Sequence, residues 1–145
     1  MGSRRRRVIG ALSAGAVPLL LGQGVAAAAF AEGEQSLTFT YQGQEVICRL
    51  FGQSDVLDGD ASAASSTNAD QDPRCAGRLT VQVTYVDDAG VRRTSGSTTA
   101  TGSDVSHAVQ GVRDSFSATH AVRFLNCDDP TDPSACELSF ATTPK

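Results

Sequence analysis

The stretch RLTVQVTYVDDAGVRR, residues 78–93, predicts a β-hairpin. Apolar residues at 79, 81, 83 and 85 alternate with polar ones, which is the period of a strand with one buried and one solvated face. The sequence DDAG that follows at 87–90 supplies side-chain hydrogen bonds and positive φ, so the chain should reverse there and return through Val91. A hairpin with one apolar face needs a second layer to cover it, and other short strands must provide that layer.

Two further pairs of segments alternate in the same way. Residues 37–41 and 46–50 flank Gln42-Gly43, and residues 121–124 and 138–140 flank a Pro- and Asp-rich connection. We therefore expect an all-β fold, an antiparallel, immunoglobulin-like β-sandwich of about seven strands. Its expected core consists of Leu37, Phe39, Val46, Leu50, Leu79, Val81, Val83, Tyr85, Val122, Phe124, Leu138 and Phe140.

Two segments are harder to assign. Residues 104–116 fit a helix stripe as well as strand alternation, and Gly111 with the β-branched residues favours strand. Residues 53–74, QSDVLDGDASAASSTNADQDPR, are polar and small, and we expect most of them to form a loop. Because so long a loop is uncommon in a compact domain, an extra edge strand around residues 61–67 is an alternative.

The N-terminus has the layout of a secretory signal peptide. Four arginines at 4–7 precede an apolar run from Val8 to Leu21, which small residues follow up to Ala31. The run is shorter than the roughly 20 apolar residues that span a bilayer. We expect residues 1–31 to be removed, with cleavage after Ala29 as the alternative, leaving a single secreted domain at 32–145. The arginines suit the general secretory route and also admit a twin-arginine signal.

Charge narrows the choice of partner. Cleavage after Ala31 leaves eight of the 12 basic residues and all 16 acidic ones, so the net charge becomes −8. A surface of that sign repels phosphate backbones and anionic lipid, which argues against nucleic acid and membrane surfaces as partners. We expect no membrane span in the mature form, and an extracellular protein or a wall component as the partner.

Four cysteines remain after cleavage. An even number in an exported chain indicates disulfides, and neither a CxxC pair nor clustered histidines suggest a metal site. Pairing Cys48 with Cys75 and Cys127 with Cys136 is one of three possible connectivities, and it joins sequence neighbours that the turns already bring together.

Six aspartates mark the two candidate binding loops. They are Asp55, Asp58 and Asp60 in residues 53–74, and Asp128, Asp129 and Asp132 in residues 128–135. The first group lacks the spacing of an EF-hand and the bidentate Glu that completes one, so we expect no bound calcium and no cofactor. Loops displayed by a rigid sheet are where binding residues concentrate.

Catalysis has little support in the sequence. His107 or His120 would have to act as the base, with a serine nucleophile at 106, 115 or 117 and an orienting aspartate at 104 or 114. No GxSxG or HExxH motif occurs, and we expect both histidines to be half-exposed strand residues. The chain is therefore not expected to be an enzyme.

Segments of this chain resemble two known groups of proteins. CAGRLTVQVTYVD, with THAVRFLNC and CELSF, resembles small exported actinobacterial proteins of unknown function, which implies a secreted β-domain. The cysteine-flanked hairpin is also similar, in topology, to the apoproteins of enediyne chromoproteins, immunoglobulin-type sandwiches that carry a small apolar ligand.

The leading hypothesis for the function of this chain is a non-catalytic extracellular or cell-wall-associated β-domain. The alternative is a secreted protease inhibitor or small-ligand carrier.

Overall fold

The structure, a computed structural model, describes residues 28–128 and 132–145. Eight strands account for most of these residues, and short 3₁₀ turns lie between some of them. The strands are β1 (Ala28–Tyr41), β2 (Gln44–Leu57), β3 (Asp60–Thr67), β4 (Gly77–Asp87), β5 (Arg92–Gly102), β6 (Asp104–Val109), β7 (Val112–Phe124) and β8 (Glu137–Thr142).

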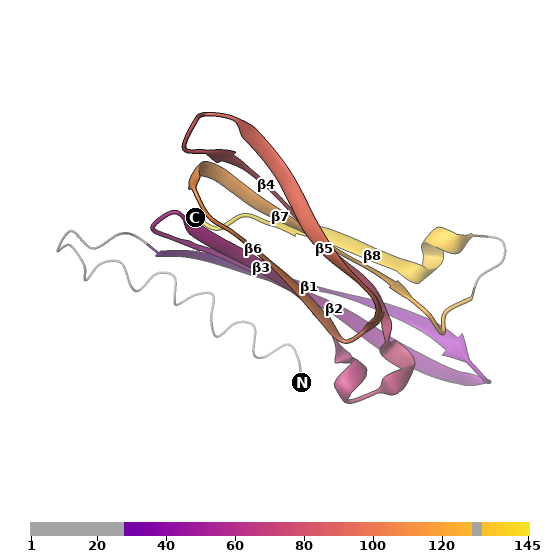
Figure 1. Cartoon of the computed structure of the whole chain (residues 1–145). Coiled ribbons are helices and arrows are strands. Elements are labelled where there is room, and N and C mark those ends of the chain that lie inside the picture. The colour runs from indigo at the N-terminus through magenta and orange to yellow at the C-terminus, as the bar shows by residue number, and fades with distance from the viewer. Residues whose placement is uncertain (1–27, 129–131) are drawn as a thin grey trace.

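The strands form two antiparallel sheets that face each other (Figure 1). One sheet has the order β1-β2-β3-β6 and the other the order β5-β4-β7-β8. The predicted β-sandwich is confirmed, with eight strands where about seven were expected. The first sheet does not have the strand order of an immunoglobulin domain. There the fifth strand lies beside the second, whereas here the neighbour of β2 is β3, the next strand in the sequence.

Tight turns set the register of the first sheet. Gln42 and Gly43 both have positive φ, as do Asp58 and Gly59, so each pair forms the two-residue turn that matches the twist of a hairpin. The predicted hairpin at residues 78–93 is also confirmed. The carboxylate of Asp87 accepts hydrogen bonds from the backbone N–H groups of Ala89 and Val91 and holds that turn closed.

All twelve predicted core residues lie in the interior or against it. Seven are buried, and the other five pack on the buried clusters. The core has two such clusters, one around the disulfides and Phe124, the other around Val83 and Phe116. Between them, at the level of His120, lie buried polar side chains.

The expected number of two disulfides is present, and their connectivity is the one of the three possibilities that joins sequence neighbours. Cys48 is bonded to Cys75, and Cys127 is bonded to Cys136. The first joins β2 to the 3₁₀ turn that precedes β4, so it connects the two sheets at one end of the sandwich. The second closes the connection between β7 and β8.

The prediction that residues 53–74 are mostly loop is wrong. Asp55 lies within β2, and the alternative strand at 61–67 is present as β3. It is an inner strand between β2 and β6 rather than an edge strand. Its small inward side chains, Ala61, Ala63 and Ser65, are buried because larger residues of the opposite sheet fill the space above them.

Residues 104–116 are strand, as predicted. They contribute β6 and the start of β7, and Gly111, with φ of 73°, reverses the chain between the two.

Most of the predicted signal peptide lies outside the described residues. Its last four residues, 28–31, belong to β1 and pair with residues 54–57 of β2. Cleavage after Ala31 therefore remains a prediction, and it would start β1 at Glu32. Within the described residues, no helix has the length and apolar character needed to cross a membrane.

Candidate functional site

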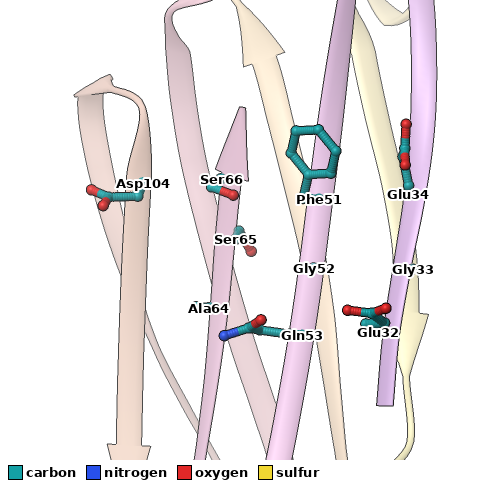
Figure 2. Close-up of a pocket in the computed structure, with 10 residues that line it drawn as sticks. All are labelled: Glu32, Gly33, Glu34, Phe51, Gly52, Gln53, Ala64, Ser65, Ser66 and Asp104. Atoms are coloured by element: carbon teal, nitrogen blue, oxygen red, sulfur yellow. The ribbon is translucent and has the colours of Figure 1, made fainter. Parts of the chain in front are cut away.

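A hollow of about 420 Å³ lies on the outer face of the β1-β2-β3-β6 sheet (Figure 2). Its clearest feature is one row of paired residues that crosses all four strands. Glu34 pairs with Phe51, Phe51 with Ser66, and Ser66 with Asp104. Residues paired in this way point to the same side of a sheet, so the four side chains share the outer face.

The hollow exists because its floor is made of small residues. Ala64 and Ser66 on β3 lie between Phe51 and Gln53 of β2 and Asp104 of β6. Longer side chains stand on both sides of this short strip, so the outer surface dips at β3. Figure 2 shows the strip between the longer side chains.

Acidic side chains line the hollow. Three carboxylates line it, those of Glu32, Glu34 and Asp104. Arg49, next to it on β2, approaches Glu34 with its Nε 3.3 Å from the carboxylate. Phe51 supplies an aromatic ring between Glu34 and Asp104.

A buried polar network supports the floor from the opposite side of the sheet. Gly52 pairs with Ser65, and both face inward onto the ring of His120. A Cβ on Gly52 would lie 2.4 Å from ring carbons of His120, so only glycine fits there without a shift. The imidazole thus packs directly beneath the backbone of the hollow.

The network has a consistent set of donors and acceptors. Ser65 Oγ donates to the carbonyl of Thr80 at 3.2 Å, so it is free to accept from His120 Nδ1 at 2.9 Å. Thr142 Oγ1 lies 2.8 Å from Nε2 of the ring, and Ser54 Oγ lies 2.8 Å from Thr142 Oγ1. With the proton on Nδ1, every one of these contacts joins a donor to an acceptor.

Burial decides the protonation of His120. The residue has no exposed surface, and this desolvation lowers the pKa of the imidazole from 6.5 to about 4, although a hydrogen bond with the backbone of Ala64 acts in the opposite direction. The ring is therefore neutral at pH 7. The prediction of a half-exposed His120 is wrong, because the residue falls on the inward phase of β7 with Ala118 and Val122.

His107 forms a second polar contact between the two sheets. Its Nε2 lies 2.8 Å from Ser95 Oγ, and its Nδ1 lies 2.8 Å from Ser97 Oγ. These bonds tie β6 to β5, the edge strands on one side of the sandwich. Neither histidine bonds the serines that the sequence offered as nucleophiles, and Asp104 lies on the face of β6 opposite to His107.

The structure separates the aspartates of the first candidate loop. Asp55 and Asp60 line another hollow, of about 370 Å³, at the β2–β3 hairpin. Asp55 also accepts a hydrogen bond from Ser62 Oγ at 2.8 Å. Asp58 lies in the turn itself with φ of 54°. Strand pairing thus accounts for a segment whose length had suggested a binding loop.

The second candidate loop is described only in part. Asp128 is exposed, and Asp129 lies outside the described residues. Asp132 caps the 3₁₀ turn Pro133–Cys136 by accepting a hydrogen bond from the backbone N–H of Ser134. In the two described ranges, no three His, Cys, Asp or Glu side chains gather closely enough to hold a metal ion.

The site on the sheet face was missed because it depends on register. In the sequence its members are separated by 17, 15 and 38 positions, and only the pairing of four strands brings them into one row.

No protein-family model, curated protein sequence or solved structure matches this chain.

Proposed function

We propose that this chain is a non-catalytic extracellular or cell-wall-associated binding domain, and that it binds its partner at the hollow on the β1-β2-β3-β6 face. The observation that carries this proposal is the row of Glu34, Phe51, Ser66 and Asp104 around a floor of small side chains. A volume of about 420 Å³ is within the range of protein ligand sites. Phe51 is of the aromatic class that is enriched at protein interfaces. The carboxylates give selectivity for a partner of complementary charge.

Other features favour binding over catalysis. The ring of His120 is enclosed in the core, where a substrate does not reach it. Both ring nitrogens of His107 are occupied by serine hydroxyls that link the two sheets. Two disulfides and the predicted signal peptide favour a location outside the cell.

The proposal is tested by filling the hollow. Ala64→Tyr places a large ring on the floor, where the position is half-buried on the outer face of β3, and tyrosine is well suited to such a strand position. Ala141→Tyr makes the same change at an exposed position of β8 in the other sheet and is the matched control. We expect the wild type and Ala141→Tyr to capture the same partner from medium or wall extract, and Ala64→Tyr to lose it while its unfolding transition is unchanged. Equal capture by all three proteins would exclude the hollow as the site.

A small-ligand carrier is the second candidate, because the same volume also admits a small molecule. A low-mass compound that co-purifies with the wild type and is absent from Ala64→Tyr would favour it. Native mass spectrometry of the two proteins distinguishes the cases.

A further inference from the structure

β1 is the longest edge strand of the sandwich. It has 14 residues, whereas the other edge strands, β5, β6 and β8, have 11, 6 and 6. In the described ranges β1 pairs only with β2, through all 14 residues and without a bulge. The β1–β2 hairpin extends past β3, whose pairing with β2 ends at Leu50, the partner of Gln35 (Figure 1). A long, regular edge of this kind is a template for pairing with another chain.

The other three edges carry features that block such pairing. Charged side chains and very short strands make an edge a poor template. β5 begins with Arg92 and Arg93, and the short strands β6 and β8 begin with Asp104 and Glu137. By contrast, residues 35–41 of β1, QSLTFTY, contain no charged residue, proline or glycine. Seven uncharged residues with this β-propensity are typical of segments that associate when they are exposed on an edge.

The turn between β1 and β2 determines which backbone groups of residues 35–41 face the free edge. Because the turn has two residues, Tyr41 and Gln44 are its hydrogen-bonded closing pair. Hydrogen-bonded and non-hydrogen-bonded pairs then alternate along the hairpin. The residues whose N–H and C=O groups point away from β2 are therefore Ser36, Thr38 and Thr40.

These outward backbone groups fit a two-fold axis at Thr38. In an antiparallel pair of β1 strands centred there, Thr38 faces Thr38 of a second copy, and Ser36 faces its Thr40. Each such pair exchanges two bonds, so the contact contains about six backbone hydrogen bonds. Both copies use the same surface, so the association closes at a dimer.

The side chains of residues 35–41 match in the same register. On the outer face the exposed Thr38 meets itself and Ser36 meets Thr40, and such hydroxyl pairs stabilise neighbouring strands. On the inner face Leu37 meets Phe39. Both pack on the core around the disulfides yet are only half-buried, so the second copy would remove further apolar surface from water. No like charges face each other within these seven residues.

We infer that the edge of β1 is an interface between two copies of this chain, which pair antiparallel about Thr38. The inference goes beyond the proposed function, because the edge of the sheet is a different surface from the hollow on its face. Cleavage after Ala29 or after Ala31 leaves residues 35–41 in place. Two acidic copies repel each other at long range, so the dimer should become tighter as salt is raised.

Sedimentation equilibrium of the protein, as the producing cells make it, tests the inference. An interface of one strand edge is small, so the concentration series extends to about 1 mM, where weak contacts still associate. We expect the average mass to rise from that of the monomer towards twice that value, and to rise further at high salt.

A charge at the two-fold axis provides the matched comparison. Thr38→Lys places two lysines directly opposite each other and should abolish the dimer. Thr98→Lys makes the same change at an exposed position of the edge strand β5 and should preserve it. Urea unfolding checks that both variants are folded.

Cysteine cross-linking tests the register. The two Thr38 residues would have Cα atoms about 5.5 Å apart, which a disulfide can bridge. The two Thr40 residues would be offset by four positions, about 13 Å along the strands, which is too far. With diamide as the oxidant, Thr38→Cys should therefore form a covalent dimer, and Thr40→Cys should remain monomeric.

A mass that stays at the monomer value up to about 1 mM would overturn the inference, as would species larger than a dimer. Association that Thr38→Lys leaves unchanged would place the interface elsewhere and overturn it too. Cross-linking of both cysteine variants, or of neither, would contradict the pairing about Thr38.

Discussion

Lowering the pH from 7 to 4 should destabilise this fold through His120 in particular. The pKa of the ring is lowered from 6.5 to about 4 by burial, and one pKa unit corresponds to 1.36 kcal/mol, so the full effect is about 3 kcal/mol. Because the folded pKa is the lower one, the unfolded chain binds more protons between these values. The stabilisation is complete above about pH 6.5 and is lost as the pH falls towards 4.

The environment of the ring compensates an imidazolium only through the hydrogen bond with the backbone of Ala64. The described side chains that bond or stack on it are Ser65, Thr142 and Phe140, and none of them carries a charge. A protonated ring would therefore be a buried charge with no charged partner among these side chains, which is an unfavourable state in a dry interior.

Urea unfolding at a series of pH values measures the effect, with His120→Gln as the variant that cannot titrate. Asp72 and Asp87 have lowered pKa values because of Arg74 and Arg93, so they also contribute to acid sensitivity, but they do so equally in both proteins. The difference between wild type and variant should shrink by about 3 kcal/mol from pH 7 to pH 4. A difference that is independent of pH would refute the reasoning. If the variant does not fold, a wild-type NMR titration that places the ring pKa near 6.5 would refute it equally.

Three further outcomes are expected. Gly52→Ala should lower the free energy of unfolding by about 1–3 kcal/mol through overpacking, whereas Gly33→Ala, on the paired residue of β1, should change it by less than about 0.5 kcal/mol because its new Cβ makes ordinary contacts. Urea unfolding of the two variants measures both changes, and similar values would contradict the account of the packing. Serine at both Cys48 and Cys75 should cost about 3.6 kcal/mol by the loop-entropy relation, again read from urea unfolding, and an unchanged stability would contradict it. The intact mass of the exported protein should correspond to cleavage after Ala31 and lie about 4 Da below that of its reduced form, and a product that retains the leader would disprove the predicted processing.

Hydrophobic alternation and turn chemistry predict most of this fold. The hairpin at 78–93 follows from local sequence, because neighbouring strands joined by short turns have few other ways to pair. The cysteine count predicts two disulfides, but their connectivity stays open until the fold is known. The strand β3 was hard to recognise because its inward residues are Ala and Ser, which carry little hydrophobic signal. Asp58-Gly59 was the available clue, since this dipeptide favours a two-residue hairpin turn.

The site is less accessible from sequence than the fold. The inward position of His120 could have been inferred from its phase with Val122 and Phe124, which were already assigned to the core. The row from Glu34 to Asp104 could not, since it requires the register of three separate strand pairings. A shift of one residue in any of them would turn part of the row to the other face.

Carboxylate labelling of the complex with its natural partner would decide whether the hollow is the binding surface. A carbodiimide reaction read by mass spectrometry reports the accessibility of each Asp and Glu in the free and bound protein. The account predicts that Asp104, which is exposed in the hollow, becomes protected on binding, while Glu45, on the same sheet but outside the hollow, reacts as before. Unchanged labelling of Asp104, with protection appearing at Asp128 or Asp132 instead, would contradict it.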